Sequence, residues 1–419
     1  MRRILLTLFA ASVTLSCSNN DSGPTDPPSD PAGPPALQLS SQSLSFAGIG
    51  GGEDPSPQTV SITNSGGEAL SGLVADVSYS GAHGWLSTVL SSGTAPATLE
   101  VAADMDGVPA GSHTATVTVS APGADNSPQT VQVELDTPYA MIGLGTLGGE
   151  ASEALDINES GQIVGWSFLP SGDWHAVLWD NGEIIDLGTL GGPDSEARGI
   201  NNLGQVVGWS RTAEGPSHAF LWEDGVMTDL GTLGGFESWA RDINDAGEVT
   251  GFSGTEADAF HAFLWEDGVM TDLDPLGDTD SEAMDINGSC QIVGIRQNSL
   301  GQSGGFLWHD GSTTDLGTLV AVGINEAGHV VGWSMERGPL LWIAGVATEL
   351  GDIHPYAVNG DDTVVGYCDF VACVWADGAI TNLEGVLGYG INDAGQVVGV
   401  GSWSESGSDW EATLWQPAP

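Results

Sequence analysis

Arginine and aromatic side chains at related positions are the first candidates for a ligand site in this sequence. Arg198 and Arg241 occupy equivalent places in two successive repeats, and the rest of the set lies in or beside segments of variable length. The set consists of Arg198, Arg241, Arg211, Trp174, Trp239, Trp403 and Trp410. Guanidinium groups and aromatic rings together suit a ligand that carries acidic groups. The simpler alternative, favoured by the 56 acidic residues, is that each arginine pairs with a nearby carboxylate such as Glu196 or Asp242.

Carboxylates are the only candidates for acid and base chemistry. The six that could converge from different repeats are Glu153, Asp156, Glu196, Asp242, Glu282 and Asp285. An enzyme that cleaves polysaccharide would need such acids close together and desolvated, whereas scattered, exposed acids would favour a binding protein. The sequence carries no nucleophile elbow, phosphate loop or metal motif. We therefore predict no catalytic residues.

Two further patterns could bind metal, and in both a structural role is the better interpretation. His175, His218 and His261 stand at one equivalent place in three successive repeats, so they point in parallel rather than converge. We expect each to be buried and hydrogen-bonded to a neighbouring repeat. Turns such as "DINDAG" resemble calcium loops only in part, because the acidic residue after Asn is missing from several copies. The prediction is no metal and no cofactor.

A repeated motif must position these residues. A short strand that ends in Ile-Asn, once Val-Asn, recurs seven times, with spacings that shorten from 43 to 33 residues. The seven asparagines are Asn158, Asn201, Asn244, Asn287, Asn325, Asn359 and Asn392. Six copies continue through three more short strands joined by turns that mostly contain glycine, which is the pattern of one antiparallel blade. The sequence predicts an all-β chain with a seven-bladed β-propeller at residues 137–419.

The two ends of the repeat region indicate how the ring closes. The seventh repeat stops after Thr413-Leu414-Trp415 without a fourth strand, and residues 139–144 resemble an unpaired fourth strand. We expect this N-terminal strand to complete the last blade. The loops between second and third strands vary most and emerge on the face that also receives the "LGTLGG" links. A binding site is expected on that face, and the recurrent third-strand tryptophans are expected to pack between blades.

The repeat resembles the extracellular HAF-repeat family. The matching pieces are "LGTLGG" at 187–192 and 230–235, "GQVVGWS" at 204–210, and "HAFLW" at 218–222 and 261–265. Later repeats drift, and 304–306 reads Gly-Gly-Phe where the family has His-Ala-Phe. The resemblance implies an extracellular propeller-like architecture and no particular reaction.

Residues 36–136 alternate apolar and polar side chains in short runs separated by turn residues, as in "QTVSITN" at 58–64. About seven such runs in a hundred residues predict an Ig-like antiparallel β-sandwich. The runs "PSPQTVSITNSGG" and "PAGSHTATVTVSA" resemble BACON-like modules of bacterial surface proteins, which implies a carbohydrate-binding or stalk role. Trp85 could stack on a sugar, but a core position is the better interpretation.

The first residues read as an export signal. Residues 1–17 combine two arginines, an apolar run and small residues, and Cys17 is the expected lipidated residue of a bacterial lipoprotein. Residues 18–35 are rich in Pro, Ser and Asp and are expected to form a disordered tether. The alternative is secretion without a lipid anchor. Cys368 and Cys373 flank a short connection and are predicted to form a disulfide, as suits an oxidising compartment.

Charge excludes some partners. The chain has a formal net charge of -49, with no lysine and seven arginines, so phosphate backbones and anionic lipids are repelled. We expect an exported, monomeric, non-enzymatic protein of the cell envelope that recognises an extracellular glycan or a surface protein. The membrane would be reached only through the lipid anchor. The alternatives are a propeller hydrolase or lyase that acts on polysaccharide, and a purely structural envelope protein.

Overall fold

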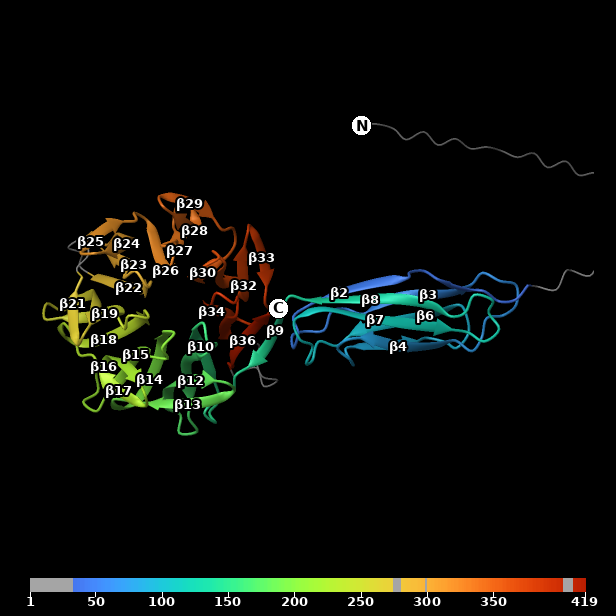
Figure 1. Cartoon of the computed structure of the whole chain (residues 1–419), viewed down its shortest axis with the longest axis horizontal. Helices are drawn as coiled ribbons and strands as arrows, with labels where there is room; N and C mark the ends of the chain where they lie inside the picture. Colours follow the sequence, from blue (N-terminus) through green and yellow to red (C-terminus); the bar gives the residue numbers. More distant parts are fainter. Residues whose placement is uncertain (1–32, 274–279, 298–299, 402–409) are drawn as a thin grey trace, which may run out of the picture.

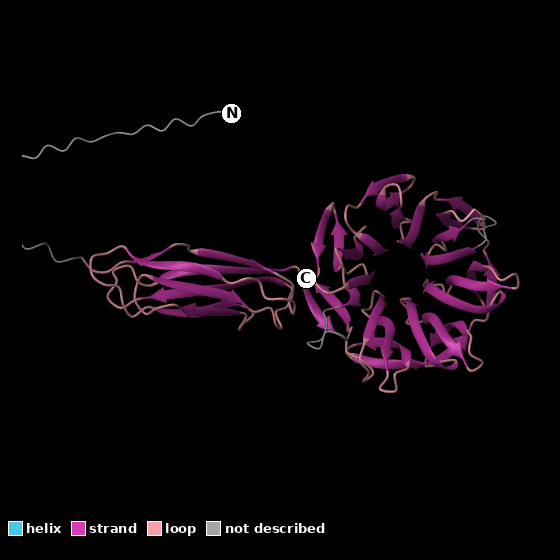
Figure 2. Cartoon of the chain, turned by 180° about the vertical axis from the view of Figure 1, so that it is seen from behind, coloured by secondary structure: helices cyan, strands magenta, loops and turns pink. Residues whose placement is uncertain are grey.

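The computed structural model describes residues 33–273, 280–297, 300–401 and 410–419. The expected leader, Cys17, most of the tether and Trp403 lie outside these residues. The described residues form strands and no helix, so the all-β expectation is confirmed (Figure 2). Nothing in the described part of the chain is a helix that could cross a membrane. The strands build nine four-stranded sheets.

Two of these sheets pack face to face in the N-terminal part. One has the order β1-β3-β6-β5 and the other β2-β8-β7-β4. Their strands are β1 (Leu37–Leu39), β2 (Ser43–Ala47), β3 (Gln58–Asn64), β4 (Val74–Ser80), β5 (Leu86–Leu90), β6 (Ala97–Ala103), β7 (Gly111–Ser120) and β8 (Gln129–Thr137). Alternate residues of these strands face a shared core that includes Val60, Leu99 and Val117. Trp85 is 2% exposed in this core, where it cannot stack on a sugar.

The other seven sheets are arranged around a ring (Figure 1). Ring sheet 1 contains β10 (Ser152–Ile157), β11 (Ile163–Phe168), β12 (Trp174–Asp180) and β13 (Glu183–Gly188). Ring sheet 2 contains β14 (Gly191–Ile200), β15 (Val206–Thr212), β16 (Ser217–Glu223) and β17 (Val226–Asp229). Ring sheet 3 contains β18 (Gly234–Ile243), β19 (Val249–Thr255), β20 (Phe260–Glu266) and β21 (Val269–Asp272). Ring sheet 4 contains β22 (Asp280–Ile286), β23 (Ile292–Gln297), β24 (Ser303–His309) and β25 (Ser312–Asp315). Ring sheet 5 contains β26 (Leu319–Ile324), β27 (Val330–Ser334), β28 (Gly338–Ile343) and β29 (Val346–Glu349).

Ring sheets 6 and 7 complete the circle. Ring sheet 6 contains β30 (His354–Val358), β31 (Val364–Cys368), β32 (Val371–Ala376) and β33 (Ala379–Asn382). Ring sheet 7 contains β34 (Leu387–Ile391), β35 (Val397–Val400), β36 (Ala412–Pro417) and β9 (Tyr139–Gly143). β9 pairs antiparallel with β36, with Trp415 opposite Met141, so the N-terminal strand supplies the outer strand of ring sheet 7. This is the pairing that the sequence predicts for residues 139–144.

The ring is held together by its asparagines. Each Asn donates from Nδ2 to the main-chain oxygen of the equivalent Asn in the next sheet, over 2.9 to 3.1 Å, and Asn392 closes the circle on Asn158. The Oδ1 of Asn158 also accepts the backbone N–H groups of Ser160 and Gln162, which fixes the turn. One side chain type therefore makes both the turn and the contact between sheets.

Apolar side chains fill the space between neighbouring sheets. The third-strand tryptophans all lie in these inter-sheet cores, and Trp179 and Trp415 are the most buried of them. The others are Trp222, Trp265, Trp308, Trp342 and Trp375, which are half-buried in the equivalent clusters. These indoles are part of the packing rather than a surface that could stack on sugars.

The first strand of each ring sheet, called its inner strand below, has a β-bulge at the same position. The bulge inserts one extra residue that has no partner on the second strand. The bulged residues are Leu155, Arg198, Arg241, Met284, Val322, Tyr356 and Tyr389. The end of the ring that carries the second-to-third loops and the links between sheets is termed the loop face below. Main-chain bridges from Leu190 to Thr212 and from Leu233 to Thr255 join links and loops there.

Candidate functional site

The arginines of the predicted ligand site are all neutralised by carboxylates. Arg198 pairs with Glu196, and Arg211 pairs with Asp194. Arg241 donates from Nε to Glu282 over 2.6 Å. The remaining arginines of the ring follow the same rule, since Arg296 pairs with Asp315 and Arg337 with Glu349. The alternative in which each arginine serves a local ion pair is therefore the one found.

Some of the predicted residues do lie together. The Arg241 guanidinium is 6.0 Å from the centre of the Trp239 ring and 5.7 Å from that of Phe252. Trp239 stacks on Trp209 of the neighbouring sheet with ring centres 4.8 Å apart. Burial lowers the pKa of Arg241, and the Glu282 carboxylate opposes that shift. This group packs two sheets together, and its guanidinium is neutralised by Glu282, while the indole Nε1 atoms of Trp209 and Trp239 are buried without a hydrogen-bond partner.

The other predicted tryptophans belong to different parts of the ring. Trp174 is half-buried and meets the edge of Phe168, with ring centres 6.0 Å apart. Trp410 precedes β36 and is 38% exposed. Among the described residues, no ring contact joins either of them to Trp239. The six predicted residues that the structure describes thus do not form one site, and Trp403 lies outside the described residues.

The predicted carboxylates are partly clustered. Burial raises the pKa of Asp156 to about 7. Burial, and then the neighbouring Asp285 carboxylate, raise the pKa of Asp242 well above its usual value. However, Asp156 accepts the N–H of Ile157 at 2.8 Å and that of Ile200 in the next sheet at 2.9 Å. These carboxylates brace neighbouring inner strands, and their desolvation follows from that position.

Glu196 differs from the aspartates because its partner is a cation. Burial raises the pKa of Glu196, and the Arg198 guanidinium partly offsets that shift. Glu153 accepts a hydrogen bond from the Trp166 indole over 2.9 Å. Glu196 is therefore tied to its own sheet, and Glu153 is tied both to Trp166 and to Tyr389 of ring sheet 7, so neither stands free as a general acid or base.

The expectation for the histidines is wrong in two respects, because they are half-buried rather than buried and their partners lie in their own sheet. His175, His218 and His261 bond to Asp186, Asp229 and Asp272 at 2.8 Å, and each partner is in the same sheet rather than the neighbouring one. The cause is that the outer strand of each sheet pairs directly with the strand that carries the histidine. Among the described residues, no group of three or more His, Cys, Asp or Glu side chains could hold a metal ion.

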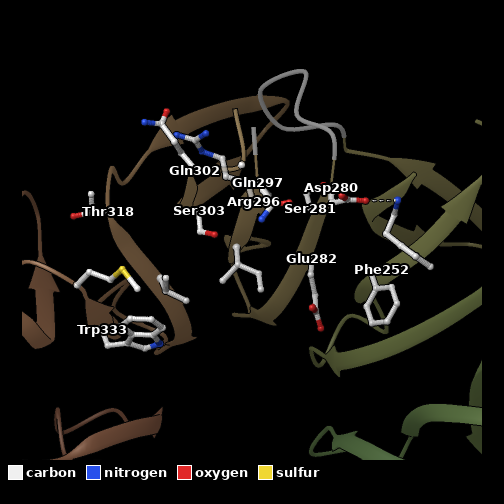
Figure 3. Close-up of a pocket in the computed structure, with 15 residues that line it drawn as sticks. Phe252, Asp280, Ser281, Glu282, Arg296, Gln297, Gln302, Ser303, Thr318 and Trp333 are labelled. Atoms are coloured by element: carbon white, nitrogen blue, oxygen red, sulfur yellow. Dashed lines mark hydrogen bonds between the residues drawn. The ribbon is translucent and has the colours of Figure 1, made fainter. Parts of the chain in front are cut away.

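An open cavity of about 770 Å³ lies on the loop face above ring sheet 4. Its apolar walls are Phe252, Phe260, Ile295, Val320, Trp333 and Met335. Phe252 and Trp333 come from ring sheets 3 and 5 and lie on opposite sides of the hollow, with Glu282 between them (Figure 3). Trp333 and Phe260 are each 38% exposed, so both offer ring surface to a ligand.

The cavity exists because ring sheet 4 departs from its neighbours. Register places Ile295 level with Trp209, Phe252 and Trp333 of the other second strands. In the third strand, Gly304 stands where the histidines stand in ring sheets 1 to 3. The isoleucine leaves open part of the space that an aromatic ring fills in the second strands of the neighbouring sheets. Gly304 contributes no open space, because it lies on the other face of the sheet and the main-chain oxygen of Gly317 covers it.

Polar groups line one side of the same cavity. Asp280 accepts the backbone N–H of Phe260 over 3.1 Å, which holds its carboxylate at the rim (Figure 3). Glu282 is held by Arg241, and Ser303 and Thr318 add hydroxyl groups. A concave site with aromatic walls and a few fixed polar groups is the usual form of a small-molecule site. Sequence reasoning missed it, although the change from "GWS" to "GIR" at 294–296 is visible in the repeats.

Comparison with known proteins shows only distant likeness. No protein-family model matches this chain, and no curated protein matches it. Among solved structures, it is similar to TolB from Acinetobacter baumannii, with a TM-score of 0.33 and 10% identity over 72% of this chain and 60% of that one. AofleA from Arthrobotrys oligospora gives a TM-score of 0.33 and 12% identity over 58% of this chain and 89% of that one. The periplasmic chaperone SfaE gives a TM-score of 0.20 and 11% identity, over 36% and 96%.

The chain spans 60% of the length of the TolB chain that it matches. TM-scores this low do not define a shared fold. The function is therefore argued from the geometry of this chain alone.

Proposed function

We propose that this chain is an exported glycan-binding protein of the cell envelope and not an enzyme. In this proposal residues 137–419 form a seven-bladed propeller of HAF-type repeats, and residues 36–136 form an Ig-like, BACON-like module that serves as a stalk. A lipid anchor at Cys17 and the 18–35 tether would attach the protein to a membrane. The protein would act as a monomer, without a metal or cofactor.

The observation that carries the proposal is the cavity above ring sheet 4. A pyranose ring has apolar C–H faces and a rim of hydroxyl groups. The faces of the ring would pack on Trp333 and Phe260, and the hydroxyls would donate to Asp280 and Glu282. Both carboxylates are held in place by other residues, so little ordering is required on binding.

The charge of the protein selects the kind of glycan. Every described arginine is paired with a carboxylate, so no cation is left over to attract an acidic sugar. With a formal net charge of -49, the protein repels acidic chains over its whole surface. The ligand of this proposal is therefore an uncharged glycan, in place of the acidic glycan that the arginines alone suggested.

A hydrolase or lyase is the second candidate, because Asp156, Asp242 and Glu196 are desolvated. Binding is favoured over catalysis because the oxygens of Asp156 bind backbone N–H groups and Glu196 binds Arg198. Incubation with the glycan that binds should release no new chain ends. Release of reducing or unsaturated ends would favour the enzyme.

A glycan array tests the binding function directly. The fragment of residues 18–419 should bind selected neutral glycans, and Trp333→Ala should abolish the signal. Trp410→Ala is the matched control, since Trp410 is equally exposed, at 38%, and lies on the same face in ring sheet 7. If the Trp333→Ala variant binds as well as the wild type, the cavity is not the site. The same holds if glycan binding is lost when residues 36–136 are removed.

A further inference from the structure

A second hollow adjoins the first. It measures about 350 Å³, lies above ring sheets 5 and 6, and shares Trp333 with the larger cavity. Its far wall is formed by Tyr367, by His354, which stacks on Tyr367 with ring centres 4.6 Å apart, and by Phe370. Each hollow alone has the size of a small-ligand site, so the two in series exceed what one sugar unit needs.

Phe370 is an unusual residue at this position. It lies in the two-residue turn between β31 and β32, has a φ of 67°, and is 85% exposed. Both central residues of such a turn have positive φ, which favours Gly, Asn or Asp and disfavours a bulky aromatic. Asp369 fits the rule and Phe370 breaks it. An exposed aromatic side chain kept in a disfavoured conformation points to a role in binding.

The turn that carries Phe370 is clamped at its base. Cys368 and Cys373 form a disulfide across the two strands, as the sequence predicts. The ring of Phe370 therefore projects over the loop face from a closed, short segment. A preorganised aromatic group loses little conformational entropy when a ligand packs on it.

We propose that the two hollows form one groove for an extended, uncharged polysaccharide chain, which crosses Trp333 and ends on Phe370. This inference rests on the proposed function and adds the polymeric nature of the ligand. The groove is lined by the carboxylates Asp280, Glu282, Asp352 and Asp369, and its one arginine, Arg296, is paired with Asp315. The excess of negative charge excludes an acidic chain from the groove.

Oligosaccharides of increasing length test the groove. The probes are the di-, tetra- and hexasaccharides of β-1,4-glucan, β-1,4-xylan and β-1,4-mannan, with oligogalacturonate as the acidic chain. Titration of the 18–419 fragment should show affinity that rises about tenfold or more from disaccharide to hexasaccharide for at least one neutral series. Oligogalacturonate should not bind.

The Phe370→Gly variant separates a binding role from a structural one. Glycine fits the positive φ, so this variant should melt at the same or a higher temperature. It should nevertheless lose about tenfold in hexasaccharide affinity and keep its disaccharide affinity. Phe236→Ala, which removes another exposed aromatic side chain, 74% exposed in β18, is the control and should change neither value.

Three outcomes overturn the inference. Equal affinity for di- and hexasaccharide, with no effect of Phe370→Gly, would confine the ligand to the first cavity and leave the proposed function standing. Tighter binding of oligogalacturonate would overturn the charge argument. If none of the oligosaccharides and no glycan on the array binds, the proposed function is overturned together with this inference.

Discussion

At the scale of single residues, the ring asparagines combine a turn with a contact between sheets. Asn201 accepts the N–H groups of Leu203 and Gln205 and donates to the main-chain oxygen of Asn244, and it is 3% exposed. The sequence predicts the turn bonds, because Asn before a glycine turn commonly caps it. The bond to the next sheet could not be predicted, because it depends on how closely the sheets approach.

The double role of Asn201 predicts a large stability loss on Asn201→Ala. The substitution leaves buried donors and an acceptor without partners, and we expect the free energy of unfolding to fall by about 2–4 kcal/mol. Asn202→Ala is the matched control. The adjacent Asn202 is exposed, and its side chain accepts the backbone N–H of Glu159 and donates to Asp245, so the loss of these exposed bonds should cost less than about 1 kcal/mol. Urea unfolding measures both, and equal losses would contradict the assigned role.

Asp156 predicts a pH dependence of stability. Its folded pKa of about 7 lies above its ordinary value of 3.8, so the folded state binds more protons than the unfolded state between those values. This group alone therefore makes the protein less stable as pH rises from about 4 to 7. Asp156→Asn removes the proton uptake, so the free energy of unfolding of the variant should fall less with pH than that of the wild type. If the free energies of unfolding of the two proteins change in parallel from about pH 4 to 7, the raised pKa of Asp156 is contradicted.

At the scale of elements, the repeat predicts strands and turns well and predicts the site poorly. Glycine turns and the Ile-Asn motif define the four strands of each sheet, and the spare strand at 139–144 finds the partner expected for it. The cavity depends on one register position, Ile295, whose neighbours on both sides carry aromatic rings. The sequence suggests the pairing of Arg198 with Glu196 in the same strand, but the pairing of Arg241 with Glu282 of the next inner strand could not be assigned before the bulge at Arg241 is known.

Restoring the repeat should close the site. Ile295→Trp introduces the ring that neighbouring second strands carry, and the cavity above ring sheet 4 has room for it. We expect glycan affinity to fall at least about tenfold while the melting temperature does not drop, because an apolar ring fills open apolar space. Ile295→Val is the control and should keep most of the affinity. Full affinity in a stable Ile295→Trp protein would place the ligand elsewhere.

At the scale of the whole molecule, the sandwich and the ring are joined by more than a linker. Ile49 of the sandwich is 3% exposed and packs with Leu383 and Trp415 of the ring. Gly50 exchanges main-chain hydrogen bonds with Tyr139 and Met141 over 2.9 and 2.7 Å. The two parts are therefore joined by a packed and hydrogen-bonded contact beside the chain connection (Figure 1). The sequence marks the boundary but not this contact, because one isoleucine in a glycine-rich segment carries no recognisable signal.

Ile49→Ala tests the junction. Removal of the buried side chain should lower the free energy of unfolding by about 2–5 kcal/mol and expose the chain near residue 138 to protease. Val89→Ala, at a position 61% exposed on the sandwich, is the control and should change neither. An Ile49→Ala protein as stable and as protease-resistant as the wild type would show that the contact does not hold the two parts together.

The central claim is that a neutral glycan binds in the groove across Trp333. A crystal structure of residues 18–419 with the hexasaccharide that binds most tightly tests it most directly. The account predicts sugar rings packed on Trp333 and Phe370, with hydroxyls on Asp280 and Glu282. A hexasaccharide found at Arg198 and Arg241, or on the sandwich, would contradict it.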